Sequence, residues 1–511
     1  MADLRRGISK TGMMILGTGG VIGTGALFGS TGMAADAGPA LVVSWLVAGF
    51  IYACIGVNYI DLGIRYPEAG GPARYSLYTH GRLTNLITSV ASLVWYVFIP
   101  PIEAVAVVEG LSHFDPGLLH SDGTPSTAGA LVAFGLILLF VPLNYFGIQA
   151  FHHLTNLIGG LKIVIYLALA IGVAVTLGHA ANFTAYHGFM PLGAAGILAA
   201  VPIAMFAFGG IRVIPDFAEE ANNPRDLRIS IIISLIGQTL IYTLFGVAFV
   251  LGLDWSRLGV GTGAWGSLGS VAGNPFVLIS TSRGVEILLI LAIVVAIIGP
   301  FGDGYVYQGA GARVLMATGR SGFGPARLKE VSERHGIPLW SLLALSAVGA
   351  VITLLTAPVP TIYTLINDAV VAGYLGFASV PVSMLVAKGR DRSVAATVIG
   401  ALGFAGASLI VYWSGWPSVP YGLLVVAVVA VVIAVFSKVT DASRALWYIV
   451  YAAFLSLMAY IGSVGAKDVV SFGIGTGIVI VVSVGVFLPW AFRSRLAAPV
   501  TEAQVPAGSA G

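Results

Sequence analysis

Long apolar runs separated by short polar breaks follow one another along nearly the whole chain. A bilayer core about 30 Å thick is crossed by about 20 residues of α-helix. By this measure the pattern predicts fourteen membrane-spanning helices, which begin near residues 12, 40, 86, 129, 154, 196, 230, 284, 338, 362, 395, 420, 445 and 469. We therefore expect an all-α polytopic membrane protein.

The composition supports this fold class. Of the 511 residues, 57% are hydrophobic and 9% are charged, whereas soluble proteins carry about 25% charged residues. We therefore expect membrane lipid to surround the helices. The single cysteine, Cys54, allows no internal disulfide, and no CxxC, HExxH or Walker-type motif is present, so we predict no metal site, no cofactor and no nucleic-acid partner. Because no catalytic constellation falls at membrane depth, we also expect no enzymatic activity.

The positive charges divide unevenly between the two sides of the predicted spans. With the N-terminus placed inside, twenty of the 25 Lys and Arg residues fall in inner segments and three in outer ones. The other two, Lys162 and Arg212, fall within spans. Because Lys and Arg accumulate in cytoplasmic loops, we predict a multi-pass protein of the cell (plasma or inner) membrane with both termini in the cytoplasm.

Two of the predicted spans are interrupted near mid-membrane. The first contains "GTGGVIGTGALFG" at 17–29, where six of thirteen residues are glycine, and the sixth, at 201–220, contains a Gly-Gly pair between two prolines. Close helix packing through Gly19 and Gly23 would explain the first cluster taken alone. Non-helical backbone at membrane depth, however, must be buried in protein or line a cavity. Paired breaks five spans apart therefore favour a binding site between two inverted repeats.

The residues around these breaks also resemble a known family. "GGVIGTGALF" at 19–28, "FAFGGIRVIPDFAEEANNPRDL" at 206–227 and "GARVLMATGRSGFGP" at 311–325 are similar to conserved stretches of helices one, six and eight in the amino acid–polyamine–organocation superfamily. The resemblance covers about residues 8–390. It implies the leucine-transporter fold, a 5+5 inverted-repeat core with discontinuous helices 1 and 6, here followed by about four extra C-terminal helices.

The implied organisation divides the chain into five parts. They are a cytoplasmic N-terminus at 1–11, a first inverted repeat at 12–178, a second inverted repeat at 196–388, C-terminal spans at 395–492, and a cytoplasmic tail at 493–511 that is small, polar and expected to be disordered.

The resemblance further implies that the substrate is an amino acid or a related amine. Backbone amides of the first break would hold its carboxylate, and backbone carbonyls of both breaks would face its amino group, which agrees with the electrostatics of helix ends. One phenylalanine of the sixth helix would close over it, with plain core packing as the alternative. The predicted substrate-binding residues are Gly19, Gly20, Gly23, Thr24, Gly25, Phe206, Phe208, Gly209, Gly210 and Arg212.

Three ionisable residues near this site are predicted to couple transport to protons: Glu103, Lys162 and Asp303. Burying a charge in the membrane costs several kcal/mol, so each is a functional hypothesis. Lys162 matches a lysine that stands in place of a sodium ion in sodium-independent members of the family, and burial favours its neutral form. The segment 297–308 lacks the Ser or Thr ligands of sodium-coupled relatives. Snorkelling of Lys162 and internal ion pairs of the carboxylates are the alternatives.

Arg212 departs from the family pattern, in which an uncharged or acidic residue often follows the sixth-helix break. A guanidinium there would suit a side-chain carboxylate, which makes an acidic amino acid a candidate substrate. An internal pair with Glu103, Asp216 or Asp303 is the alternative.

The sequence thus predicts a secondary active amino acid transporter that works by alternating access, coupled to protons and independent of sodium. An amino acid exchanger without proton coupling and a non-transporting sensor would share these motifs. The sequence does not predict the particular amino acid, the stoichiometry or the oligomeric state.

Overall fold

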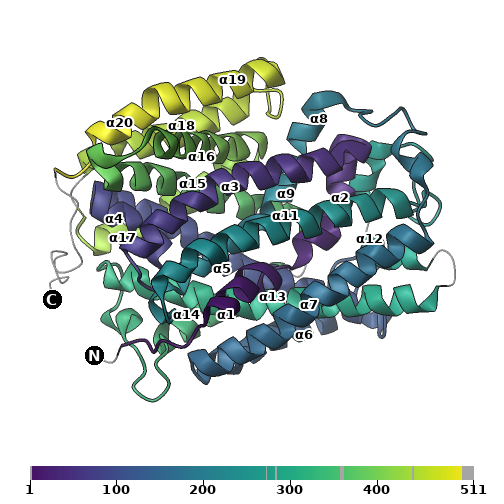
Figure 1. The fold of residues 1–511 in the computed structure, drawn as a ribbon, viewed down its shortest axis with the longest axis horizontal. Coiled ribbons are helices and arrows are strands. Elements are labelled where there is room, and N and C mark those ends of the chain that lie inside the picture. Colours follow the sequence, from purple (N-terminus) through teal and green to yellow (C-terminus); the bar gives the residue numbers. More distant parts are fainter. Residues whose placement is uncertain (1–2, 272, 282–284, 357–361, 440–441, 498–511) are drawn as a thin grey trace.

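The computed structural model describes residues 3–271, 273–281, 285–356, 362–439 and 442–497. These residues form a bundle of long helices that share one main direction (Figure 1), and they contain no β-strand beyond isolated bridges. Twelve segments of the described chain are long and apolar enough to cross a membrane; the first, Lys10–Arg65, contains three α-helices, and Leu339–Leu355 is a shorter apolar helix. The predicted fold class is confirmed.

The first part of the bundle contains the first broken span and the four spans that follow it. Its helices are α1 (Lys10–Ile15), α2 (Thr24–Ala37), α3 (Leu41–Arg65), the short α4 (Tyr75–His80), α5 (Arg82–Leu111), α6 (Thr127–Tyr145) and α7 (Ile148–Thr176).

The second part begins with two short helices and contains the second broken span. Its helices are α8 (Gly193–Ala199), α9 (Val201–Ala207), α10 (Val213–Asp216), α11 (Leu227–Gly252), α12 (Pro275–Ser280), α13 (Glu286–Arg320), α14 (Leu339–Thr356) and α15 (Ile362–Lys388).

The C-terminal part consists of α16 (Val394–Trp413), α17 (Ser418–Phe436), α18 (Ala442–Ile461), α19 (Phe472–Val482) and α20 (Leu488–Arg493). A π-helical turn, Ser483–Phe487, joins the last two helices. The predicted disordered tail falls mostly on 498–511, which lies outside the described residues.

Burial separates central from peripheral helices. The apolar stretch of α5 is 78% buried, whereas that of α17 is 22% buried. Helix α17 exposes Val428, Val432, Val435 and Phe436, an apolar face that suits contact with lipid. Helix α5 packs against α13 and α15 at the centre of the bundle, so it can bring polar side chains to a site that lipid does not reach.

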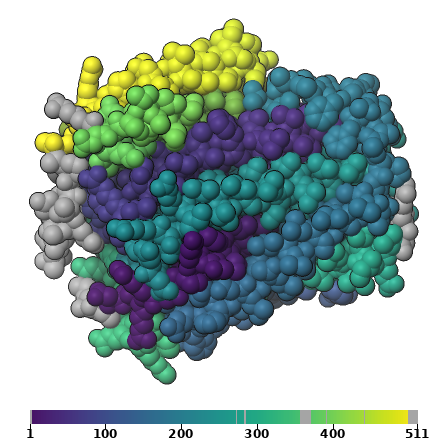
Figure 2. All heavy atoms as spheres, in the orientation of Figure 1, coloured from purple at the N-terminus to yellow at the C-terminus, as the bar shows by residue number. Residues whose placement is uncertain are grey.

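Helices α16, α18, α19 and α20 lie along one flank of the bundle, seen at the top of Figures 1 and 2 in green and yellow. Helix α16 packs against both α3 and α15. Gly403 and Gly406 face α3, where a methyl group would contact Cys54 and Ile51, and Gly400 faces Leu385 of α15. Glycine therefore lines both interfaces of α16.

Candidate functional site

The first break forms where the glycine-rich segment predicted it. Helix α1 leads into a π-helical turn, Leu16–Gly20, and α2 begins at Thr24 after three non-helical residues. A side chain on Gly19 would overlap the backbone of Gly159 in α7. Glycine is therefore needed because the broken segment lies directly against its neighbouring helix.

The second break is tighter than the first. Helix α9 ends at Ala207, a 3₁₀ turn covers Phe208–Arg212, and α10 follows. The sixth span thus loses its α-helical geometry as predicted, by tightening into 3₁₀ helix, which often marks a hinge at mid-helix. A side chain on Gly210 would overlap Val21, so the two breaks are in direct contact.

A carboxylate of the protein itself occupies the start of α2. The Thr24 amide donates to both carboxylate oxygens of Glu103 at 3.2 Å, and the Thr24 hydroxyl donates to Oε1 at 2.7 Å. Glu103 is fully buried, and the N-terminus of the 14-residue α2 carries partial positive charge. Sequence reasoning placed the substrate carboxylate at these amides and did not foresee that Glu103 would bind there.

The other two predicted proton-coupling residues meet Glu103 at the same break. A side chain on Gly23 would collide with both Asp303 and Glu103, and Lys162 Nζ donates to the Gly20 carbonyl at 3.1 Å. Lys162 interacts electrostatically with both carboxylates. Because Lys162 is 0% exposed, the snorkelling alternative is wrong.

Several polar side chains that bind the breaks were not predicted. Tyr166 donates to the Gly23 carbonyl at 3.2 Å, Gln238 to that of Gly17 at 2.6 Å, and Tyr242 to that of Ala207 at 2.8 Å. Their sequence signal is weak, because a single polar or aromatic residue on an apolar helix looks like ordinary packing. These bonds satisfy carbonyls that the breaks release.

Arg212 lies in an aromatic cage beside the second break. It is 1% exposed, and its guanidinium carbon lies 4.4 Å from the ring centre of Phe377, 4.8 Å from that of Tyr96 and 5.9 Å from that of Trp95. Within the described chain, its Nε and Nη1 have no hydrogen-bond partner. The ion pairs found among the described residues do not include it.

The predicted internal partners of Arg212 are engaged elsewhere. Glu103 and Asp303 lie at the first break, and Asp216 accepts a hydrogen bond from Tyr96. Asp216 still influences Arg212 electrostatically, so the buried guanidinium charge is partly balanced without a direct ion pair.

More buried polar atoms around Arg212 lack partners in the described part of the structure. They are the hydroxyls of Tyr52 and Tyr59, Nε1 of Trp95 and Oδ1 of Asp216, and each of these residues either interacts electrostatically with Arg212 or lies against it. Buried polar groups nearly always have a partner, so a cluster of unsatisfied ones calls for an explanation such as a bound ligand or water.

The two candidate lid phenylalanines have different surroundings. Phe208 is fully buried, and its ring packs against Trp45, Tyr52 and Tyr242. Phe206 lies 5.7 Å from Trp95, ring centre to ring centre, on the side of the unsatisfied polar cluster. Each phenylalanine thus packs against a residue of the unsatisfied cluster, Phe206 against Trp95 and Phe208 against Tyr52, and Phe206 is the more exposed of the two, 5% against 0%.

Two acidic residues after α10, Glu219 and Glu220, form ion pairs with arginines of α13. Glu220 is buried and pairs with Arg313, with Nη2 and Oε1 at 2.7 Å. Glu219 pairs with Arg320 at 2.6 Å. Burial acts to raise the pKa of Glu219, but the hydrogen bonds and charge of Arg320 outweigh it, so this pKa lies below its usual value.

A many-span bundle with two touching breaks and buried charges has the architecture of a secondary transporter. A family model described as amino acid permease matches residues 9–405. The aspartate-proton symporter of Bacillus subtilis (strain 168) is 31% identical to this chain, with 91% of each chain covered. The glutamate/serine transporter AimA of the same organism is 28% identical, covering 97% of this chain and 95% of its own. The aromatic amino acid transport protein AroP of Escherichia coli (strain K12) is 25% identical, covering 70% and 76%. The chain belongs to the amino acid permease family.

Proposed function

We propose that this permease carries an acidic amino acid, aspartate or glutamate, into the cell together with protons and independently of sodium. Its two termini lie in the cytoplasm. The observation that carries the proposal is Arg212, a buried cation beside the second break with two guanidinium nitrogens unpaired within the described chain. The names of two relatives, an aspartate-proton symporter and a glutamate/serine transporter, support it.

Arg212 distinguishes the substrate side chain. Its planar guanidinium binds a carboxylate through two parallel hydrogen bonds, and the unsatisfied Tyr52, Tyr59 and Trp95 supply neutral donors nearby. A buried cation without a direct partner is costly. Binding of an acidic side chain removes that cost, whereas binding of a neutral side chain leaves it in place.

Glu103 couples substrate binding to proton binding. The α-carboxylate of the substrate and the carboxylate of Glu103 compete for the same donors at Thr24. Glu103 already lies beside Asp303, and two buried carboxylates side by side cannot both stay charged once the substrate takes the donors of Thr24. One of them therefore takes up a proton, while the ammonium of Lys162 balances the other. The proton belongs to the interacting group rather than to one residue.

Alternating access follows from movement of one set of helices against another. The moving set comprises the first, second, sixth and seventh spans (α1–α3 and α9–α11), and the scaffold comprises α5, α6, α13 and α14. Phe206 closes over the substrate. The pairs Glu219–Arg320 and Glu220–Arg313 join the two sets at the cytoplasmic end, so they hold the inner gate closed in this conformation.

Uptake into proteoliposomes tests this function. We expect aspartate and glutamate to accumulate under an inward proton gradient at any sodium concentration, with serine and phenylalanine as comparison substrates. Uptake that requires sodium and ignores the gradient would contradict the coupling. Counterflow without pH dependence would indicate an exchanger, and no transport of any substrate would indicate a sensor.

The variant Arg212→Gln tests the substrate class. Loss of a buried charge-assisted contact costs about 2–3 kcal/mol, so we expect the KM for aspartate to rise about 30- to 150-fold and that for serine to change much less. Arg212→Lys serves as the matched control, because lysine keeps the positive charge but cannot form the bidentate hydrogen bonds of a guanidinium. Equal losses for all substrates would make Arg212 a structural cation.

A further inference from the structure

A cationic pocket lies at the end of the bundle, away from the helix breaks. It has a volume of about 570 Å³ and is lined by the end of α3, by α4, by the turn between α15 and α16, and by the segment after α20. In Figure 1 this region lies at the left, near the labels of α4 and α20. Four cationic side chains line the pocket, against one carboxylate, Asp391: they are Arg65, Lys388, Arg392 and Arg495.

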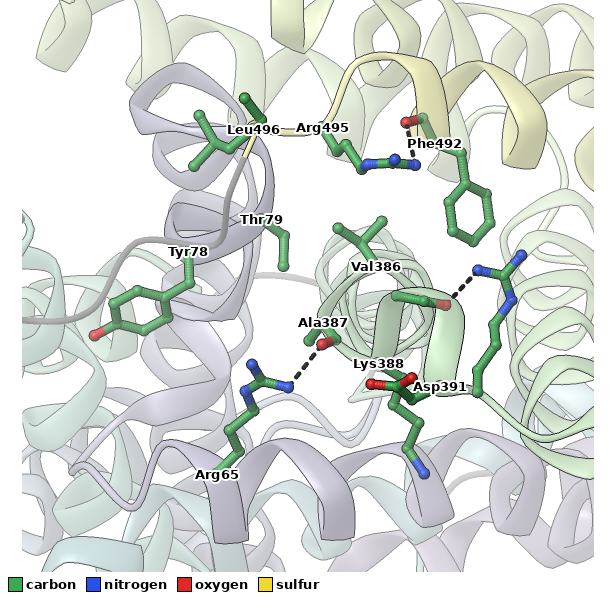
Figure 3. A pocket seen from close by; sticks show the side chains of 13 residues that line it. Arg65, Tyr78, Thr79, Val386, Ala387, Lys388, Asp391, Phe492, Arg495 and Leu496 are labelled. Atoms are coloured by element: carbon green, nitrogen blue, oxygen red, sulfur yellow. Dashed lines mark hydrogen bonds between the residues drawn. The ribbon is translucent and has the colours of Figure 1, made fainter.

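Three of these cations are guanidinium groups anchored to the pocket wall. Arg65 donates to the Ala387 carbonyl at 2.6 Å, Arg392 to that of Gly389 at 2.8 Å, and Arg495 to that of Phe492 at 3.3 Å. Arg65 and Arg495 enter from opposite sides of the pocket (Figure 3). Each guanidinium carries five N–H donors, so most of the donors stay available to a ligand.

The fourth cation is partly neutralised. Lys388 Nζ lies 2.7 Å from Asp61 Oδ2, so this lysine contributes less to the pocket's charge. The Leu496 amide donates to the Thr79 carbonyl at 2.8 Å and fixes the chain after α20 against α4. This hydrogen bond fixes the position of the segment that forms one wall of the pocket.

Helix capping alone does not explain this arrangement. Ala387 and Phe492 lie in the last turns of α15 and α20, where a cation stabilises the helix end. One donor at each end is enough for that purpose. Capping does not account for the cavity between the helices. It also does not account for the position of Arg392, whose guanidinium carbon lies 4.8 Å from the ring centre of Phe492.

We propose that this pocket binds a phosphate group, supplied by the headgroup of an anionic phospholipid or by a soluble phosphate. Guanidinium forks match phosphate oxygens in geometry and charge. Helices α3, α15 and α20 all end at the pocket, which places it at the depth of lipid headgroups, where basic pockets bind anionic lipids. Bound phosphate joins α3 to the turn after α15 and to the segment after α20.

Lipid binding to the purified full-length protein tests the proposal. Binding of phosphatidylglycerol is measured by native mass spectrometry and by the thermal midpoint, with phosphatidylcholine as the zwitterionic comparison. In the double variant Arg392→Gln, Arg495→Gln, we expect the affinity for phosphatidylglycerol to fall at least about tenfold. The control, Arg228→Gln, removes the same kind of charge from an exposed position on α11 and should bind as the original chain does.

A competition experiment needs no variant. If the pocket recognises phosphate, inorganic phosphate displaces phosphatidylglycerol from the original protein. Stabilisation by inorganic phosphate with no added effect of the lipid supports the soluble source, and stabilisation by phosphatidylglycerol beyond that of phosphate supports the lipid. Equal affinity of the original chain and the double variant for phosphatidylglycerol, without displacement by phosphate, would overturn the proposal.

Discussion

Glu103 is the residue on which the proposed coupling depends. Its carboxylate is fully buried and accepts hydrogen bonds from the amide and hydroxyl of Thr24. Charge-assisted bonds at a helix N-terminus stabilise a buried carboxylate, while the neighbouring Asp303 disfavours charge on both carboxylates at once. The same donors cannot serve two carboxylates at once.

The variant Glu103→Gln should separate exchange from accumulation. The amide cannot ionise, so proton-driven accumulation should be lost, whereas counterflow of substrate should persist. Substrate affinity should rise several-fold, because an amide binds the α2 amides more weakly than a carboxylate does. Uptake with and without a proton gradient measures both effects.

Glu109→Gln is the matched control, since Glu109 lies on the same helix nearer its end, with Oε1 close to Gly273 and not among the groups that bind the Thr24 amide. Accumulation that survives in Glu103→Gln would contradict the coupling role.

The sequence predicted these charges better than their partners. Glu103, Lys162 and Asp303 stood out because a charge at membrane depth is expensive, and the structure brings them to one break. Their meeting depends on packing between helices that are distant in the chain, which no local pattern encodes. Tyr166 was missed for the same reason, because its role depends on the Gly23 carbonyl opposite it.

At the scale of elements, the contact between α2 and α9 holds the two breaks together. A methyl group on Gly25 would lie 2.7 Å from Cβ and 2.8 Å from Cα of Ala207. These helices therefore approach more closely than any residue with a side chain permits. The glycine pattern predicted both breaks. It did not predict that the second would tighten into 3₁₀ helix, because residue propensities for α-helix and for 3₁₀ helix are too similar to tell them apart.

The variant Gly25→Ala should force α2 and α9 apart. We expect it to lower the free energy of unfolding by about 1–3 kcal/mol and to weaken substrate binding. The control is Gly29→Ala, one turn further along α2, where a methyl group would meet only Ile203 Cγ2 at 3.4 Å. Thermal midpoints and substrate affinities measured side by side test this, and equal effects of the two variants would refute it.

At the scale of the whole molecule, most of the C-terminal helices form a layer on the transporter core. The hydrophobic pattern predicted the spans of this layer, yet not where they pack. An almost uniformly apolar helix such as α17 can pack against lipid or protein on any face, so its sequence does not indicate its neighbours. Only the structure places α16 between α3, which belongs to the proposed moving set, and α15.

Two glycines of α16 offer a matched pair of variants. Gly406→Ala places a methyl group against Ile51 of α3, and Gly400→Ala places one against Leu385 of α15. If α3 moves during transport, Gly406→Ala should slow uptake several-fold with substrate affinity unchanged. Gly400→Ala should lower the thermal midpoint without slowing uptake. Equal rates in the two variants would contradict movement at the α3–α16 interface.

The smooth glycine face of α16 has a wider consequence. Relatives that share the two breaks but carry bulkier residues on this face should keep the same cargo and differ in turnover number. Speed would then evolve separately from selectivity, through substitutions in accessory helices that never touch the cargo.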